Sequence, residues 1–280
     1  MALSPSDVRR LLADAGLEPR RSLGQNFVVD ANTVARIARL AEVGPGDDVV
    51  EIGPGLGSLT LALLDTGAAI TCIETDGNLI PILEGVTEGR ARVIHGDARE
   101  VDWATVIPGT GWTLVANLPY NLGTSLVIDV LDHVPAVQRL LVMVQREAGE
   151  RMVAGVGDGA YGAVSVRIAM RASGAIVAVV PPTVFYPRPK VTSCLVSLKR
   201  HEKPAIPPDL DESLVIGLLR AGFAQRRKML RRSLKAMTDA ETITRAGIRP
   251  EARAEELDLE AWIALARAVY GSNSDEEISG

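Results

Sequence analysis

The feature that most constrains the fold is a series of short apolar runs with segments of helical periodicity between them. Five runs have the composition of buried strands, and two more are expected after a helix that starts near Tyr161. Strands that alternate with helices form βαβ units, in which a mainly parallel sheet carries helices on both faces. We therefore predict an α/β fold of the Rossmann-like kind. The predicted strands are 48–52, 69–73, 92–95, 112–117, 139–144, 175–180 and 192–198.

The pattern changes after the last predicted strand. Residues 199–208 are polar and rich in proline, as in a linker, and residues 209–270 show only helical periodicity. We expect one domain over residues 1–200, including N-terminal helices, and a small helical domain over 201–270. The last ten residues, 271–280, are small, polar or acidic, and we expect a disordered tail there.

Composition excludes several classes of site. The two cysteines lie in apolar runs, and none of the three histidines is at ligand spacing from a cysteine or another histidine. We therefore expect neither a metal site nor a histidine-based triad. The chain has no apolar targeting segment and no stretch of membrane-spanning length, so we expect a soluble, cytoplasmic protein that does not bind membranes.

A glycine-rich turn follows the first predicted strand. Gly53, Gly55 and Gly57 form a G-x-G-x-G pattern, and Ser58 stands where a dinucleotide fingerprint requires its third glycine. Glycines allow a tight turn and a close approach of the backbone to a ligand, although a plain strand-to-helix turn has the same composition. The spacing disfavours a pyrophosphate and hence a nicotinamide cofactor.

Acidic residues end the next two predicted strands. Glu74 lies 21 residues after Gly53, where a carboxylate can accept both ribose hydroxyls, and Asp97 is placed to accept a cofactor amino group. Either acid alone would pass as a loop residue or a helix cap. Ligands of open α/β sheets bind at the carboxyl ends of strands, so the combination predicts a nucleoside cofactor without pyrophosphate, S-adenosylmethionine.

The fourth predicted strand ends in Asn117-Leu118-Pro119-Tyr120. The Asn117 side-chain oxygen and the Leu118 carbonyl can accept the two N–H groups of an adenine amino group and turn its lone pair toward a methyl donor. Pro119 stiffens the turn, and Tyr120 can stack on the base. Catalysis of this kind consists of positioning and electrostatics, without a covalent intermediate.

The segment 181–191 is rigid and carries two aromatic and two cationic side chains. We expect Phe185 to cover the other face of a flipped-out adenine, with Lys190 or Arg188 on phosphate. A hydrophobic anchor for a proline-rich loop is the alternative interpretation.

Residues 217–235 contain seven cations and no acid, although the whole chain has a net charge of −5. A solvated helix face usually mixes both signs, so we predict a basic, RNA-binding helix here. The residues expected to bind phosphate are Arg226, Arg227, Lys228 and Arg231.

Together these motifs resemble the ribosomal RNA small-subunit adenine N6,N6-dimethyltransferase family, of the KsgA/RsmA type, from Leu23-Gly-Gln-Asn-Phe27 to Arg226-Arg-Lys228. The resemblance implies a class I S-adenosylmethionine-dependent methyltransferase sheet. It also implies cofactor contacts from Asn26 and the backbone of Val28, together with the strand-end residues above and Asn117. The base-handling elements of the family match Asn117–Tyr120 and Phe185–Val191.

The resemblance further implies that the substrate is a pair of adjacent adenosines in the 3′-terminal hairpin loop of 16S rRNA, dimethylated in an immature 30S subunit. We expect a monomer. Two alternatives stay open: a resistance-type methyltransferase for 23S rRNA, and an assembly factor in which methylation is incidental. A DNA adenine methylase is disfavoured, because such enzymes typically carry proline where Leu118 stands.

Overall fold

A computed structural model describes residues 3–20 and 23–278, and the chain divides into two compact units. The first unit comprises residues 1–149 and 174–200, and the second comprises residues 150–173 and 201–280. The chain crosses between the units three times, and the third crossing follows residue 200, where the sequence analysis places the domain boundary. Residues 150–173, predicted to lie in the first domain, belong to the second unit.

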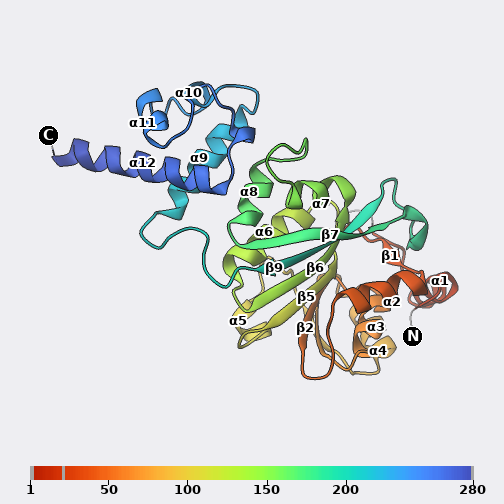
Figure 1. Ribbon diagram of the computed structural model, residues 1–280. Helices are drawn as coiled ribbons and strands as arrows, with labels where there is room; N and C mark the ends of the chain where they lie inside the picture. The colour runs from red at the N-terminus through yellow and green to blue at the C-terminus, as the bar shows by residue number, and fades with distance from the viewer. Residues whose placement is uncertain (1–2, 21–22, 279–280) are drawn as a thin grey trace. The chain divides into compact units, whose positions relative to one another are not determined.

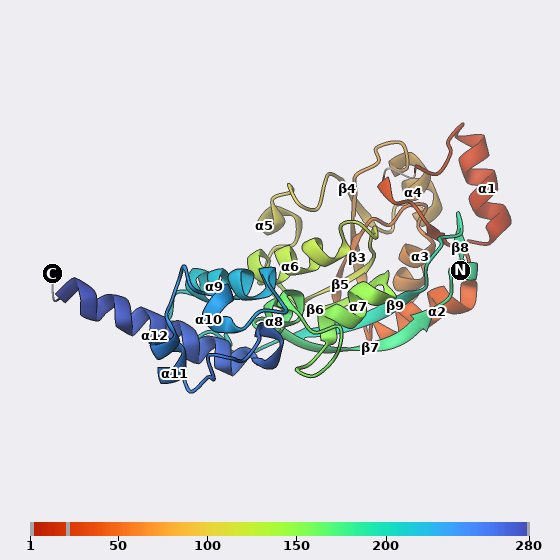
Figure 2. The same ribbon diagram turned by 90° about the horizontal axis from the view of Figure 1, so that it is seen from above.

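The first unit is built on a seven-stranded sheet with the strand order β4-β3-β2-β5-β6-β9-β7. The strands from β4 to β6 are parallel, and β9 runs antiparallel to β6. This mixed sheet confirms the predicted α/β class, and Figures 1 and 2 show its strands at the centre of the unit with helices around them. The strands are β2 (Asp48–Ile52), β3 (Ala69–Glu74), β4 (Arg92–His95), β5 (Trp112–Asn117), β6 (Val137–Gln145), β7 (Ala172–Val180) and β9 (Ser193–Arg200).

Local sequence signals start several of the helices around this sheet. Ser4 and Asp7 form a capping box at the start of α1, and the Asp30 carboxylate accepts a hydrogen bond from the Thr33 amide at the start of α2. The helices are α1 (Pro5–Asp14), α2 (Ala31–Leu40), α3 (Ser58–Leu64), α4 (Ile80–Thr87), α5 (Trp103–Val106) and α6 (Gly123–His133), while α7 (Arg146–Val153) begins in this unit and ends in the second.

A second, two-stranded sheet pairs β1 (Phe27–Val28) with β8 (Phe185–Tyr186), which follows a 3-10 turn, η2 (Pro182–Val184). The strands are antiparallel, with Phe27 opposite Tyr186 and Val28 opposite Phe185. Two segments about 160 residues apart in the chain are thereby joined, a pairing that local sequence patterns do not predict.

The second unit has its own apolar core. Tyr161, at the start of the segment that leads into α8, donates a hydrogen bond to the Leu257 carbonyl (2.7 Å) and meets the Phe223 ring edge-on. These contacts explain why residues 150–173 group with this unit. Its elements are α8 (Ala163–Ala169), α9 (Glu212–Ala224), α10 (Leu230–Ser233), α11 (Ala240–Arg245), η3 (Ala254–Glu256) and α12 (Leu259–Ile278).

The C-terminal segment differs from the expected tail. α12 continues to Ile278, because residues 271–278 contain no proline that would stop a helix already formed over residues 259–270. Residues 279–280 lie outside the described part of the chain. Among the described residues, no helix is long and apolar enough to cross a bilayer.

Candidate active site

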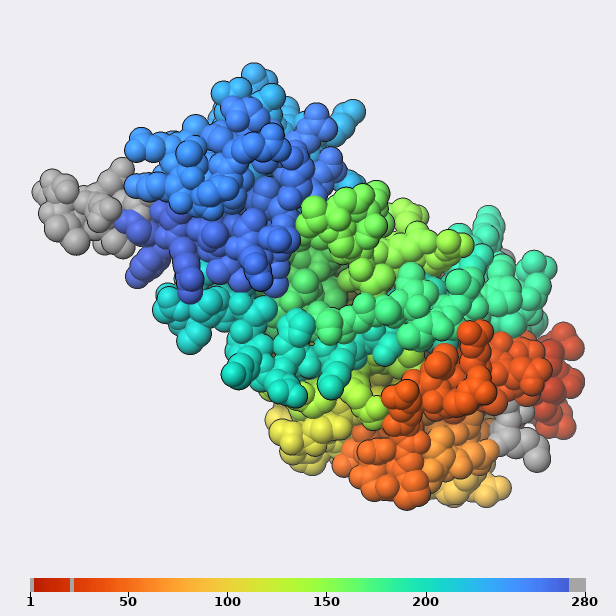
Figure 3. Space-filling model, viewed as in Figure 1, coloured from red at the N-terminus to blue at the C-terminus, as the bar shows by residue number. Residues whose placement is uncertain are grey.

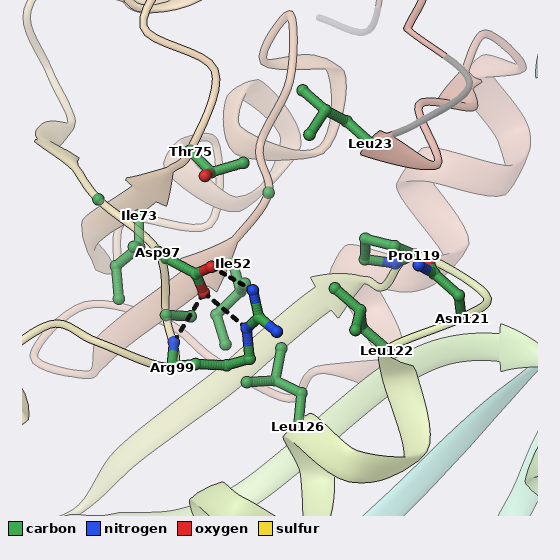
Figure 4. A pocket seen from close by; sticks show the side chains of 13 residues that line it. Leu23, Ile52, Ile73, Thr75, Asp97, Arg99, Pro119, Asn121, Leu122 and Leu126 are labelled. Atoms are coloured by element: carbon green, nitrogen blue, oxygen red, sulfur yellow. Dashed lines mark hydrogen bonds and ion pairs between the residues drawn. The ribbon is translucent and has the colours of Figure 1, made fainter.

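The strand register brings the predicted cofactor residues to one edge of the sheet. Ile52 pairs with Ile73 and with Ala116, and Glu74 pairs with His95, so Gly53, Glu74, Asp97 and Asn117 follow neighbouring strand ends. A cavity of about 350 Å³ opens at this edge (Figure 4). The residues that line it are Leu23, Ile52, Gly53, Ile73, Thr75, Gly96, Asp97, Ala98, Arg99, Pro119, Asn121, Leu122 and Leu126.

The glycine turn after β2 requires glycine for two different reasons. Gly53 has φ +66° and lines the cavity, where its backbone is open to a ligand. Gly55 has φ +60°, and a Cβ atom there would lie 2.9 Å from the Phe27 ring. Gly55 therefore positions the turn against β1 and does not itself line the cavity.

Glu74 is buried, with 4% of its surface exposed, and both its carboxylate oxygens accept backbone hydrogen bonds. Oε2 accepts from the Gly55 amide (3.0 Å) and Oε1 from the Asp76 amide (2.8 Å). Burial raises the pKa of Glu74, although these amides partly offset the effect. Each oxygen keeps further acceptor capacity, so the geometry is compatible with the predicted ribose contact.

Asp97 follows β4 and forms a close ion pair with Arg99 (2.6 Å), which Figure 4 shows at the side of the cavity opposite Pro119. The hydrogen bonds from Arg99 lower the pKa of Asp97, so this carboxyl stays ionised at neutral pH. Arg99 is a lining residue that the sequence analysis missed. The only indication of this role in the local sequence is that Arg99 is a cation two positions after Asp97.

Asn117 is oriented by the N-terminal segment. Its Nδ2 donates to the Asn26 carbonyl (2.9 Å), which turns its Oδ1 away from that contact. Neither this oxygen nor the Leu118 carbonyl accepts a hydrogen bond from any residue that the structure describes. The Leu118 amide donates a hydrogen bond to the Met143 carbonyl (3.0 Å). The two oxygens that the sequence analysis assigned to the adenine amino group are therefore both available as acceptors.

The segment containing Asn26 packs directly on this motif. A Cβ atom at Gly24 would lie 2.9 Å from Pro119 Cβ, and the Asn26 side chain donates to the Gly24 carbonyl (3.0 Å). Asn26 and Val28 do not line the cavity. Asn26 positions Asn117 through its carbonyl, and Val28 lies in the β1–β8 pair, so the cofactor contacts assigned to these two residues stay predictions.

Phe185 and Tyr120, the side chains predicted to stack on the adenine, are less exposed than expected. Phe185 is 4% exposed and packs in the core of the first unit. The Tyr120 hydroxyl shares a hydrogen bond with Ser193 (2.7 Å), and burial raises the pKa of Tyr120. Lys190 and Arg188 are exposed in the loop over residues 181–191, which lies at the surface close to α1 (Figure 3).

The predicted basic helix is interrupted. α9 ends at Ala224, residues 225–229 form a turn, and α10 begins at Leu230, so Arg226, Arg227 and Lys228 lie in a loop. The Leu230 amide donates to the Ala252 carbonyl (2.8 Å) instead of continuing the hydrogen-bond ladder of α9. A tertiary contact therefore overrides the local helical pattern.

The exposed cations of this segment differ in their partners. Arg226 pairs with Glu255 (2.6 Å), and Arg231 lies 3.8 Å from Glu251. Within the described part of the chain, Arg227 and Lys228 form no ion pair. We call residues 226–235 the cationic segment.

A carboxyl group that the sequence analysis did not assign lies beneath the glycine turn. Glu51 is almost completely buried on β2 and accepts a hydrogen bond from the Thr60 hydroxyl (2.7 Å). Burial raises the pKa of Glu51 to about 8, so this side chain is largely protonated at neutral pH. No group of three or more metal-ligating side chains occurs among the residues that the structure describes.

Comparison with known proteins identifies the family. The sequence profile of the family described as "Ribosomal RNA adenine dimethylase" matches residues 16–269. The chain belongs to the ribosomal RNA adenine dimethylase family. As such a dimethylase it is an enzyme that uses S-adenosylmethionine to methylate adenine in ribosomal RNA, and the nicotinamide-dependent alternative is excluded.

Curated relatives of this dimethylase cover nearly its whole length. A ribosomal RNA small subunit methyltransferase A from Cutibacterium acnes is 44% identical, with 98% of this chain and 97% of the relative covered. One from Thermobifida fusca is 43% identical, with 94% of this chain and 95% of the relative covered.

Two solved structures share the fold. A dimethyladenosine transferase from Plasmodium falciparum has a TM-score of 0.73 at 22% identity and covers 87% of this chain and 97% of that chain. The 23S rRNA methyltransferase ErmE has a TM-score of 0.67 at 25% identity and covers 88% and 100%. These matches confirm the class I methyltransferase architecture.

Proposed function

We propose that this dimethylase places two methyl groups on the N6 nitrogen of each of two adjacent adenosines in the 3′-terminal hairpin loop of 16S rRNA. The proposed substrate is the immature 30S subunit in the cytoplasm, and the protein is proposed to act as a monomer. The printed names of the curated relatives, which specify the small ribosomal subunit, support this choice of RNA.

The observation that carries the proposal is the pair of unused acceptors on Asn117 and Leu118. The lone pair of an exocyclic adenine nitrogen is delocalised into the ring, so the nitrogen is a poor nucleophile. Two fixed oxygens that accept its N–H groups localise the lone pair and favour the developing positive charge. Because Asn26 and Met143 hold the motif from its other side, these acceptors are preorganised.

The cofactor is assigned to the cavity beside this motif. The residues proposed to hold it are Gly53 through its backbone, Glu74 at the ribose hydroxyls and Asp97 at the adenine amino group. S-adenosylmethionine supplies, when bound, an electrophilic methyl group on a positively charged sulfur. No protein base is required at Asn117, because the methylated nitrogen becomes acidic as its charge develops.

Binding of the target RNA is assigned to three sets of residues. Tyr120 and Phe185 are proposed to contact the flipped adenine, and Lys190 the phosphate backbone. The cationic segment is proposed to contact rRNA phosphates through Arg226, Arg227, Lys228 and Arg231. The exposure of these cations supports the assignment.

The direct test is transfer of radiolabelled methyl groups from S-adenosylmethionine to small subunits that lack the modification. Fully modified small subunits, large subunits and DNA serve as parallel substrates. We expect label only on the unmodified small subunit, recovered as N6,N6-dimethyladenosine. Label on 23S rRNA would indicate the resistance-type activity, and no label on any substrate would favour an assembly factor.

A further inference from the structure

Arg99 holds the carboxylate of Asp97 through three hydrogen bonds. Its backbone amide donates to Oδ1 (2.9 Å), its Nε donates to the same oxygen (3.1 Å), and its Nη2 donates to Oδ2 (2.6 Å). Figure 4 shows the guanidinium beside the cavity, held to Asp97 by these bonds. The side-chain contact is bidentate, which fixes the orientation of the carboxylate as well as its charge.

The number of acceptor sites that remain on Asp97 is small. A carboxylate offers about four lone-pair sites, two on each oxygen. Arg99 uses both sites on Oδ1 and one on Oδ2, which leaves a single site on Oδ2. A ligand in the cavity can therefore use one acceptor of fixed direction, and no donor.

We propose that Arg99 determines the base specificity of the cofactor site, by fixing Asp97 as a single ionised acceptor that accepts a 6-amino purine and rejects a 6-oxo purine. The inference rests on the proposed role of Asp97 at the adenine amino group. A 6-oxo group would oppose a lone pair to the carboxylate oxygen, and because Arg99 fixes the orientation of the carboxylate, Asp97 cannot turn away to relieve this opposition.

The surroundings of Arg99 offer it another carboxylate. Asp97 raises the pKa of the Arg99 guanidinium most, and Glu100 and Asp129 raise it less. Arg99 also lines a second cavity of about 300 Å³, together with Trp103, Asp129 and His133. If Arg99 instead had to move to Asp129 before the cofactor could bind, it would compete with the cofactor for Asp97. That role is the opposite of the one proposed.

The experiment compares the binding of S-adenosylhomocysteine and its 6-oxo analogue, S-inosylhomocysteine, by calorimetry. The wild-type protein is measured beside Arg99→Met, which keeps the length of the side chain without its charge, and Arg36→Met as a matched control. Arg36 is exposed on α2, away from the strand-end residues. Thermal unfolding establishes that each variant is folded.

We expect the wild-type protein and Arg36→Met to prefer the adenosyl ligand by about a hundredfold. In Arg99→Met this preference falls by about tenfold, and the loss of adenosyl binding on acidification begins at a higher pH, because Asp97 no longer has a cation to lower its pKa. Glu74 lies at the same edge of the sheet and also titrates, but it is present in all three proteins, so its contribution cancels in the comparison.

Other outcomes overturn the inference. Unchanged affinities in Arg99→Met would show that Arg99 does not affect cofactor binding. Tighter adenosyl binding in this variant would show that Arg99 competes with the cofactor for Asp97. Asp97→Ala, which removes the acceptor, separates this inference from the proposed function. If Asp97→Ala leaves adenosyl binding intact, the role of Asp97 itself is wrong; if it weakens binding while Arg99→Met changes nothing, only the inference about Arg99 fails.

Discussion

The strand-end site of the first unit and the cationic segment of the second unit both carry polar groups that we propose to contact nucleotides, but they hold these groups in different ways. Glu74 is buried and fixed by two backbone amides, and Asn117 is fixed by the Asn26 carbonyl. In the cationic segment, Arg227 and Lys228 are exposed, and no described residue pairs with them.

The difference agrees with what each region is proposed to recognise. A single small ligand is selected by a few acceptors whose positions are fixed before binding. A polyanion is attracted by exposed charges that release counterions, and such binding depends strongly on salt and little on exact geometry. We therefore expect single substitutions to have large effects at the strand ends and small, additive ones in the cationic segment.

The largest effect is expected from Asn117→Ala. Loss of one preorganised partner of the developing charge should lower kcat by about a thousandfold. Cofactor binding should stay measurable, which titration with S-adenosylhomocysteine would check. Gln138→Ala, a half-buried amide at the opposite end of the sheet, is the matched control and should behave as wild type. Loss of both binding and transfer would instead assign Asn117 to the cofactor site or to folding.

Glu51→Gln tests how the buried carboxyl beneath the glycine turn affects the stability of the fold. Burial raises the pKa of Glu51 from 4.5 to about 8, so the folded state holds the proton more tightly than the unfolded state does. The free energy of unfolding then falls as pH rises through this range, by about 5 kcal/mol. Glutamine keeps an acceptor for Thr60 but cannot ionise. The variant should match the wild type in thermal unfolding at pH 4.5 and exceed it at pH 9, and parallel curves at both pH values would contradict this.

Glu74→Gln addresses the ribose contact. The amide cannot accept at both positions, so we expect the affinity for S-adenosylhomocysteine to fall by about tenfold to a hundredfold. In the wild type, acidification protonates Glu74 at a pH above its usual range, and affinity falls as pH is lowered through that value. The variant should lack this decline. A wild-type affinity that does not change with pH would argue against the contact.

The smallest effects are expected in the cationic segment. Arg227→Gln with Lys228→Gln should weaken binding to small subunits and reduce the salt slope by about 2, since each cation contacts at most about one phosphate. Arg226→Gln should change the slope less, because Glu255 already holds this side chain. Arg249→Gln, an exposed arginine paired with Glu256, is the control. Filter binding at several salt concentrations measures all of these, and an unchanged slope in the double variant would remove the segment from the interface.

The sequence predicted the α/β class and the edge of the sheet where the site is expected, because local composition indicates which segments form strands and where those strands end. Gly53, Glu74, Asp97 and Asn117 each follow an apolar run, and parallel strands bring such positions together whatever the details of packing. The family resemblance then supplied the chemistry, through a motif at the fourth strand end whose two oxygens suit an adenine amino group.

Only the tertiary structure decided which partners these residues have. The hydrogen bond from Asn117 to Asn26, the pairing of β1 with β8 and the grouping of residues 150–173 with the helical unit all join distant parts of the chain. The helical periodicity around Arg226 was overridden by the bond between Leu230 and Ala252. Local patterns record which conformation a segment favours, whereas the direction of a side-chain acceptor depends on a donor or carbonyl that the fold brings from elsewhere.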